Sequence, residues 1–449
     1  MFLKVNDKIL LTIKRIGING EGIGFYKRKA VFVENGLPGE VVEVKITKVL
    51  DKYAEGEIVK FKTKSPHRIE APCKYYHKCG GCQLQHLSYP YQLHEKRNIL
   101  IESFERYYDG DISRITFHEM IGMDNPWRYR NKSSLPVRHD GDKVVVGMYA
   151  KKSNHLVYIE DSLVENNLIS NVRTNILDIL TKSNVDIYNP RTKTGSLRYL
   201  VIRGFEETNE VQVTFILSRF DKKLINILKK LDVTSANYSI NADQRSVDIF
   251  GDTVINVAGK EMIEGRLGDL KFEISPQAFF QLNTKQSLTL YEEINKAANL
   301  TGKEKVLDCY CGIGSIAMYL AKDCEEVRGI DNNKAGIEDA NRFAKLNNIK
   351  NAKFYAGNIL PYLHQFKDKG FVPDVLIVDP PRKGLDLNLI NYLKGSNIKK
   401  IVYVSCNTST LAKNLNHLKK EYRVEYVTPV DMFPQTSHVE CVTLMSRVE

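Results

Sequence analysis

The last third of the chain has the pattern that most constrains the fold, because short apolar runs alternate there with helical stretches. The runs include KVLDC, EVRGID, DVLIVD and KKIVYVSC, and several end in a glycine, an acid or a cysteine. Short apolar runs alternating with helices are typical of parallel strands buried on both faces. We therefore expect an α/β fold with a doubly wound parallel sheet over residues 271–449.

The first 62 residues have a different pattern, in which apolar and polar positions alternate in short runs separated by glycine-rich turns such as NGEGIG. Five such runs predict an OB-like β-barrel over residues 1–62, a fold suited to gripping nucleic acid. The polar segment KTKSPHRIEAPC, which follows these runs, predicts a domain boundary near residue 62. Residues 63–270 mix β-like runs with helical stretches, so we expect a central α/β domain, with residues 91–123 packing on the C-terminal domain.

Length and charge limit the classes of function. A chain of 449 residues suggests about three domains. Its apolar runs are too short to span a membrane and its first residues do not resemble a signal peptide, so we expect a cytoplasmic protein with no membrane partner. The net charge is +11, and residues 1–100 hold 18 basic and 10 acidic side chains. This excess suits a polyanionic partner such as RNA, although a solvated lysine-rich surface has the same composition.

Several motifs place reactive or binding side chains directly after predicted strands. In VLDCYCGIGSIA, Gly312 and Gly314 allow the backbone to approach a ligand at a helix N-terminus, and Asp331 of GIDNN is positioned to hold a ribose diol. This spacing suits a dinucleotide as well as other nucleosides. Asp379 of DPPRKG and Cys406 of VSCN follow two further strands. Ligands bind at this carboxyl edge in open α/β sheets.

The ordered set DCYCGIG, GID, DPPRKG, VSCN and HVECV resembles the RNA uracil-5-methyltransferases, and the resemblance extends over essentially the whole chain. It implies a Rossmann-like class I methyltransferase domain and S-adenosylmethionine as cofactor. The N-terminal segment resembles the TRAM domain of the ribosomal-RNA branch of this family. The implied reaction is methylation of carbon 5 of a uridine in RNA, with 23S ribosomal RNA favoured over transfer RNA as substrate. We expect a monomer.

Two other functions compete with this interpretation. Amino-methyltransferases of adenine or guanine also carry Asp-Pro-Pro at the sheet edge, but they need no cysteine nucleophile and usually place an aromatic residue where Arg382 stands. A non-catalytic RNA-binding or assembly factor would keep the fold without the reaction. The presence of both Cys406 and Glu440 favours the enzyme.

The resemblance implies catalytic roles for three residues. Cys406 would add to carbon 6 of uracil, which makes carbon 5 nucleophilic. Glu440 of HVECV would remove the carbon 5 proton, so that β-elimination releases the product. Asp379 would lie beside both and contact the target or the cofactor. Arg382 is a candidate for stabilising the Cys406 thiolate.

Binding residues also follow from the resemblance. For the cofactor they are Gln281, Tyr310, Gly312, Asp331, Asn358 and Asp379. For the RNA they are Arg130, Asn131, Phe280 and Arg382, while Trp127 is a candidate for stacking on a base. Two positions depart from the family pattern: Thr408 replaces a proline after SCN, and Asp331 stands where many members have glutamate. We expect a local adjustment of the turn and retained activity.

Three cysteines within ten residues resemble the iron–sulfur motif of the family: Cys73, Cys79 and Cys82. Iron–sulfur clusters normally take four cysteines, and Ser162 stands where the family has the fourth. Three alternatives remain open. They are a cluster with serine or an external fourth ligand, a zinc site using His77 or His86, and a metal-free loop.

Overall fold

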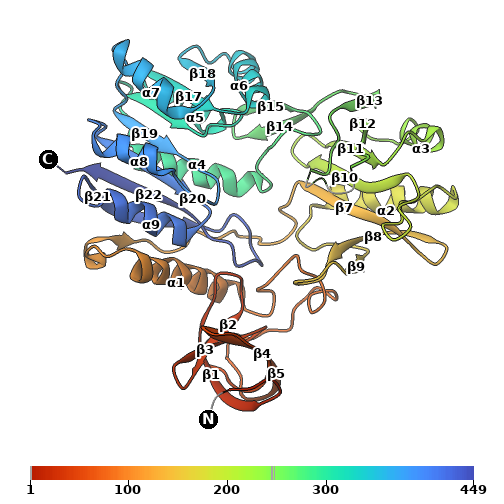
Figure 1. The fold of residues 1–449 in the computed structure, drawn as a ribbon. Helices are drawn as coiled ribbons and strands as arrows, with labels where there is room; N and C mark the ends of the chain where they lie inside the picture. The colour runs from red at the N-terminus through yellow and green to blue at the C-terminus, as the bar shows by residue number, and fades with distance from the viewer. Residues whose placement is uncertain (1–2, 244–245, 247, 449) are drawn as a thin grey trace.

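The N-terminal strands close into a barrel in the computed structural model, which describes residues 3–243, 246 and 248–448. The barrel order is β1-β2-β3-β5-β4, as Figure 1 shows in red. Its strands are β1 (Lys8–Ile16), β2 (Gly22–Tyr26), β3 (Lys29–Val33), β4 (Val41–Val49) and β5 (Tyr53–Thr63). Burial alternates along β1, where Ile9, Leu11 and Ile13 point into the barrel. The predicted five-stranded barrel is confirmed.

A seven-stranded sheet forms the middle of the chain, in the order β13-β12-β11-β10-β7-β8-β9. The strands are β7 (Lys132–Asp140), β8 (Lys143–Tyr149), β9 (Leu156–Ile159), β10 (Leu197–Phe205), β11 (Glu210–Leu217), β12 (Ser235–Ile240) and β13 (Val254–Gly259). Helices α2 (Asn167–Lys182) and α3 (Lys222–Leu228) accompany it, and a hairpin of β14 (Ile263–Leu267) and β15 (Leu270–Ile274) follows. This mixture of strands and helices matches the expected α/β character.

The C-terminal sheet has eight strands in the order β18-β17-β16-β19-β20-β22-β21-β6. They are β16 (Lys305–Cys309), β17 (Glu326–Asp331), β18 (Ala352–Ala356), β19 (Val375–Val378), β20 (Lys400–Ser405), β21 (Tyr422–Val430), β22 (Glu440–Arg447) and β6 (Thr116–Phe117). Its helices are α4 (Thr284–Ala298), α5 (Ser315–Leu320), α6 (Lys334–Leu346), α7 (Ile359–Asp368), α8 (Leu387–Lys394) and α9 (Thr408–Leu418). The strands from β16 to β20 are parallel, and β22 runs antiparallel to β20. The predicted parallel α/β sheet is present.

Helix α1 (Tyr89–Tyr107) and β6 come from the first 117 residues of the chain but belong to the C-terminal layer. The helix packs along α9, and β6 pairs with β21. The Ser103 hydroxyl lies 2.7 Å from the hydroxyl of Thr408, the residue that replaces the proline of the family pattern. The threonine thus begins α9 and also contacts α1, which a proline side chain could not do by hydrogen bonding.

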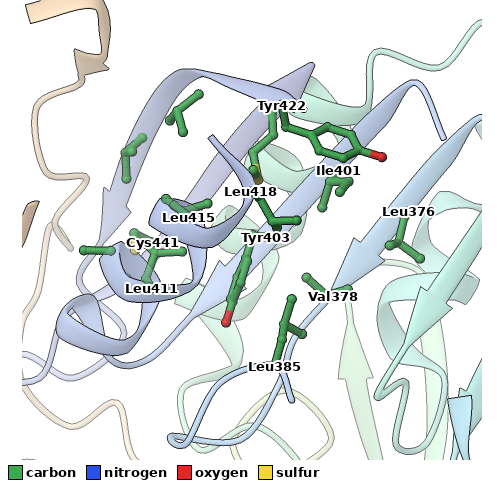
Figure 2. Packing of buried hydrophobic residues seen from close by; sticks show 14 of the residues in the cluster. Leu376, Val378, Leu385, Ile401, Tyr403, Leu411, Leu415, Leu418, Tyr422 and Cys441 are labelled. Carbon is green, nitrogen blue, oxygen red and sulfur yellow. The ribbon is translucent and has the colours of Figure 1, made fainter. Parts of the chain in front are cut away.

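The core beneath α9 explains why this helix lies on the sheet. Leu411, Leu415 and Leu418 recur at helical spacing and face β20, as Figure 2 shows around Tyr403. The Tyr403 hydroxyl is satisfied because it donates to Asn414 Oδ1 at 2.8 Å. This packing holds the end of β20, and therefore the residue that follows it. No helix in the described part of the chain is long and apolar enough to cross a membrane.

Candidate active site

The parallel strands end at one edge of the C-terminal sheet and bring the predicted site residues there. Asp331 ends β17, Asp379 follows β19 and Cys406 follows β20. Strand β22 runs in the opposite direction, so its first residue lies at the same edge. The last paired residues of β20 and β22 are Ser405 and Cys441, and the next position on each strand holds Cys406 and Glu440. The structure therefore places the predicted nucleophile opposite the predicted base.

Burial dominates the electrostatics of this edge. It raises the pKa of Asp379 to about 7 and that of Glu440 to about 8, with the nearby Asp379 charge adding to the effect on Glu440. Burial also raises the pKa of Cys406, and the two carboxylates raise it further. Arg382 lowers it, as the sequence suggested, but less than burial raises it. In the free protein Cys406 is therefore a neutral thiol at pH 7.

Arg382 and His438 form a polar pair beside the nucleophile. Arg382 Nη2 lies 3.2 Å from His438 Nδ1. Because a guanidinium can only donate, Nδ1 accepts and the neutral ring carries its proton on Nε2. Burial, followed by the charge of Arg382, lowers the pKa of His438 to about 4, so this ring is neutral at pH 7. His438 had no predicted role from the sequence. Its place in the HVECV motif, two residues before Glu440, was the signal that could have identified it.

The glycine loop after β16 makes a cradle at the same edge. Gly312 has a φ of +55°, and a Cβ built on it would have open space around it. Asp331 Oδ2 accepts from the Gly312 N–H at 2.9 Å, and Asp331 Oδ1 accepts from the Asn333 N–H at 2.8 Å. Tyr310 also has a positive φ, +65°, and its N–H donates to Ile330 O. The loop thus leaves room for a ligand directly beside the Asp331 carboxylate.

The remaining predicted cofactor residues lie on segments around this edge. Gln281 is half-buried and precedes α4, and its carbonyl accepts from the Asn131 amide at 2.8 Å. Asn358 is exposed at the N-terminus of α7, with no capping hydrogen bond from its side chain. Asn131 itself is only 3% exposed, and its amide also donates to Thr284 Oγ1. Asn131 is therefore placed to position the Gln281 segment, and the predicted RNA contact does not fit its burial.

The two neighbouring phenylalanines of SPQAFFQLN have opposite environments. Phe280 is 3% exposed and packs edge-on against Phe205 and Phe272 in the core. Phe279 is 69% exposed. The position of Phe280 therefore does not support the predicted substrate contact. Of the two rings, the exposed one of Phe279 is accessible to a substrate. Which of two adjacent aromatics is buried depends on how the loop packs, so the sequence carried no signal for it.

A small cavity of about 100 Å³ contains Cys406. Arg382, Asn407 and His438 line one part of it. The rest of the lining includes Ile99 of α1 and, from the barrel, Ile18 and Asn19. Sequence reasoning missed these two barrel residues because they stand almost 400 positions before the nucleophile.

Arg130 lines a second cavity, of about 280 Å³. That cavity is lined by Cys73, Cys79, Cys82 and Ser162 among others. The Arg130 N–H donates to Val164 O, which ties the residue to the segment after Ser162. The charge of Arg130 also helps to lower the pKa of His438, which lines the Cys406 cavity. The RNA contact of Arg130 stays a prediction. Trp127 lines a third, open cavity of about 660 Å³ together with Asn131.

The donor set of the cysteine cavity decides whether it suits an iron–sulfur cluster. Three cysteines line the space, and Ser162 is one of three serines that line it with them. Burial raises the pKa of Cys79 and raises that of Cys82 to about 11. Within the described residues, no three His, Cys, Asp or Glu side chains converge as a metal-binding group. His86, the buried histidine considered for zinc, lies 2.5 Å from the Tyr76 hydroxyl through Nδ1. These residues do not fit a four-cysteine cluster.

Comparison with known proteins identifies the family. The model of the tRNA (uracil-5-)-methyltransferases matches residues 88–448, and the TRAM domain model matches residues 3–59. A Bacillus cereus protein named as an uncharacterized RNA methyltransferase is 44% identical over 451 residues, covering 99% of this chain and 98% of the relative. A Listeria innocua protein named in the same way is 44% identical over 448 residues, covering 98% of both chains.

A solved structure shares the whole architecture. The tRNA (uracil-54, C5)-methyltransferase of Pyrococcus abyssi, in complex with S-adenosyl-L-homocysteine, superposes with a TM-score of 0.77 at 29% identity. The match covers 97% of this chain and all of that one. The nucleophile, base and glycine loop predicted from the sequence meet at one edge of this fold. With a family model over residues 88–448 and relatives aligned over nearly its full length, this chain belongs to the tRNA (uracil-5-)-methyltransferase family and carries a TRAM domain at its N-terminus.

Proposed function

We propose that this protein methylates carbon 5 of a uridine in RNA, using S-adenosylmethionine and a covalent adduct between Cys406 and carbon 6 of the base. The observation that carries the proposal is the juxtaposition of Cys406 and Glu440 across β20 and β22, beside the half-buried Asp379. A methyltransferase acting on an amino group of a base needs neither a thiol nor this opposed carboxylate. The pairing of the two groups therefore favours chemistry at a ring carbon.

Cys406 begins the reaction by losing its thiol proton to solvent and adding to carbon 6 as a thiolate. The new sulfur–carbon bond moves the electron pair of the carbon 5–carbon 6 double bond toward carbon 5 and the carbonyl oxygen at carbon 4, which makes carbon 5 nucleophilic. Neutral His438 lines the cavity that holds Cys406, and its Nε2 carries the ring proton. A hydrogen-bond donor in a desolvated site stabilises negative charge that develops on a substrate oxygen.

Glu440 completes the reaction once carbon 5 carries the methyl group. Its carboxylate takes the carbon 5 proton, the electron pair re-forms the ring double bond, and the bond from Cys406 to carbon 6 breaks. The raised pKa of Glu440, about 8, suits a base that must accept a proton from carbon. Asp379 is half-buried beside the pair, and its charge raises the pKa of both partners.

The glycine loop has the features required to hold S-adenosylmethionine, which when bound supplies the methyl group. The open space over Gly312 admits an adenosyl or methionine portion. Each oxygen of Asp331 accepts one backbone N–H and keeps a lone pair for a ribose hydroxyl. Tyr310, Gln281 and Asn358 would complete the binding site. The Pyrococcus abyssi relative is in complex with S-adenosyl-L-homocysteine, which supports this assignment.

The RNA class is proposed as 23S ribosomal RNA, with transfer RNA as the alternative. The N-terminal residues match the TRAM domain model. Their resemblance to the TRAM domain of the ribosomal-RNA branch supports the first. The Pyrococcus abyssi relative is named for uridine 54 of transfer RNA, which supports the second. No step of the reaction above depends on the cysteine cavity.

One labelling experiment tests the proposal. Purified protein is incubated with methyl-labelled S-adenosylmethionine and total RNA from a strain lacking its gene, and the labelled nucleoside is then identified and mapped. Label in 5-methyluridine of 23S RNA is expected. Label in 5-methyluridine of transfer RNA would retain the chemistry and replace the substrate. Label in methyladenine or methylguanine would show an amino-methyltransferase, and no label would favour an assembly factor.

A further inference from the structure

One turn of the N-terminal barrel forms part of the wall around Cys406. The turn joins β1 to β2 and contributes Ile18 and Asn19 to the cavity that holds the nucleophile. Figure 1 shows the barrel below α1. The barrel is therefore continuous with the active site.

Hydrogen bonds within the turn fix its shape. The Gly17 N–H donates to Glu21 O at 2.7 Å, and the Gly20 N–H donates to Gly17 O at 2.9 Å. The Glu21 carboxylate accepts from both the backbone N–H and the side-chain amide of Asn19, each at 3.2 Å. With its backbone and the Asn19 side chain engaged in this way, the turn presents Ile18 in a defined position.

Contacts with other segments fix the turn relative to the catalytic pair. The Ser437 hydroxyl donates to Ile18 O at 2.9 Å, three residues before Glu440. Gly20 has a φ of +89°, and a Cβ on it would lie 2.6 Å from Cβ of Gln83, so only glycine permits this close approach. The barrel is also joined to α1 by the ion pair between Arg15 and Glu102.

The Ile18 side chain remains 57% exposed, although the Ile18 carbonyl accepts a hydrogen bond from the Ser437 hydroxyl. Single exposed apolar side chains are common on protein surfaces and need no explanation by themselves. Leu10, on β1 of the same barrel, is 60% exposed in this way. What distinguishes Ile18 is that it borders the cavity of the nucleophile on a turn that cannot retract easily.

We propose that Ile18 packs against the RNA base next to the target uridine and occupies the space that the uridine leaves when it enters the Cys406 cavity. This inference rests on the proposed function. A base inside a stacked RNA must be extruded to reach a nucleophile, and losing its stacking costs a few kcal/mol. Apolar side chains inserted at a base step compensate part of that cost.

Charge on the barrel supports RNA as the occupant. Residues 1–62 hold 12 basic and 8 acidic side chains. Exposed Lys14 lies on the strand that leads into the turn, where an ammonium can meet a phosphate next to the extruded nucleotide. A wedge beside a basic strand matches an RNA backbone with one unstacked base.

The test compares two RNAs that contain the uridine mapped by the labelling experiment. One is a hairpin in which the flanking bases stack on the uridine, and the other carries abasic sites at both flanking positions. Ile18→Ala is expected to lower kcat/KM on the stacked hairpin by about tenfold or more, and on the abasic RNA by less than about twofold. Ile18→Leu should retain most of the activity. Leu10→Ala is the matched control for loss of an exposed apolar side chain and should match the wild type on both RNAs.

A fluorescence readout separates base extrusion from later steps. With 2-aminopurine next to the target uridine, wild-type protein should increase the emission on binding, and Ile18→Ala should do so less. Equal activity of Ile18→Ala and wild type on the stacked hairpin would overturn the inference. An equal loss of kcat/KM on both RNAs would also overturn it, because a structural defect would impair methylation of the stacked hairpin and of the abasic RNA alike. If the wild type makes no 5-methyluridine on any RNA, the proposed function itself has failed.

Discussion

At the scale of single residues, burial decides the protonation states of the catalytic groups. Cys406, Asp379 and Glu440 each lie in a desolvated place, and each has a pKa above its ordinary value. Arg382 opposes this shift for Cys406 and Glu440 but does not cancel it. In the free protein the thiol and the Glu440 carboxyl are therefore mainly protonated at pH 7, whereas the reaction needs both deprotonated.

The pH dependence of methylation follows from the raised pKa values of Cys406 and Glu440. The base form of Glu440 increases as the pH rises through about 8, and the thiolate of Cys406 also increases with pH. We therefore expect the single-turnover rate to rise by about twentyfold or more between pH 6.5 and 8.5, since one deprotonation gives up to tenfold per pH unit below its pKa. Rapid-quench assays across pH 6–9 measure this. A rate that is flat over the whole range would show that neither group titrates there.

Glu440→Gln tests the base directly. The amide keeps the shape of the side chain but cannot take the carbon 5 proton, so addition and methylation proceed and elimination stalls. We expect a protein–RNA adduct that survives a denaturing gel and contains the labelled methyl group. Cys406→Ala in the same background is the control and should form no adduct. Turnover of Glu440→Gln at the wild-type rate would assign the base elsewhere.

At the scale of elements, the loop after β16 depends on two glycines with different surroundings. Gly312 and Gly314 both have positive φ, at +55° and +76°. A Cβ at Gly312 would enter open space, whereas a Cβ at Gly314 would lie 2.4 Å from a ring carbon of Phe354. One glycine therefore keeps room for a ligand, and the other permits α5 to pack on the sheet.

Alanine substitutions should separate these two roles. Gly312→Ala is expected to weaken S-adenosylhomocysteine binding by about tenfold or more, or 1.4 kcal/mol, with a loss of stability of about 1–2 kcal/mol from the backbone conformation. Gly314→Ala should lose a further ~1–3 kcal/mol through overpacking. Calorimetric titration and thermal unfolding measure the two effects. Equal stability of the two variants would contradict the assignment.

A buried ion pair joins α1 to the segment that leads to Glu440. Lys96 Nζ lies 2.6 Å from Asp431 Oδ1, and both side chains are fully buried. Lys96 also donates to Phe433 O, and the Tyr89 hydroxyl donates to Asp431 Oδ2 at 3.0 Å. This network holds the start of the loop between β21 and β22 against α1.

Breaking the pair should be more damaging than removing it. Lys96→Met leaves Asp431 buried without a cation, and we expect a loss of about 3–5 kcal/mol in unfolding free energy. The double variant with Asp431→Leu leaves no buried charge and should lose clearly less. Urea unfolding of the intact chain, followed by circular dichroism, gives both values. The single variant Asp431→Leu is measured in the same way. If the double variant loses as much unfolding free energy as the two single variants together, the charges are not coupled.

At the scale of the whole molecule, the parts of the chain meet on the loop at residues 431–439. The N–H groups of Gln83 and Leu84 both donate to Gln435 O, and the Tyr129 hydroxyl donates to Pro434 O at 3.0 Å. The amide of Asn283 donates to Met432 O. The barrel, the cysteine segment and the central region all therefore touch the segment that ends at Glu440. The division into residues 1–62, 63–270 and 271–449, like the monomeric state, stays a prediction.

Net charge predicts how RNA binding responds to salt. The chain carries a charge of +11, and each phosphate contact by lysine or arginine releases counterions. We expect the affinity for the substrate RNA to fall by about tenfold or more between 50 and 200 mM potassium chloride. Filter binding with the Cys406→Ala protein measures this without turnover. An affinity that does not change with salt would mean that stacking and base contacts carry the binding.

Much of the fold was predictable because it is encoded locally. The alternation in residues 1–62 and the apolar runs before Asp331, Asp379 and Cys406 specify strands through side-chain periodicity, and the confirmed barrel and parallel sheet follow from that. Strand direction then brings the residues after parallel strands to one edge. The gathering of Asp331, Asp379 and Cys406 there needed no knowledge of packing.

The tertiary structure alone decided which side chains are buried and which distant segments meet. Phe279 and Phe280 are adjacent in sequence, yet one is exposed and the other is in the core. Arg130 lies at the cysteine cavity, whereas Ile18 borders the cavity of Cys406. The raised pKa of Cys406 likewise comes from burial beside two carboxyl groups. Periodicity reports only neighbours along one element, whereas desolvation and long-range contact depend on how all the elements pack together.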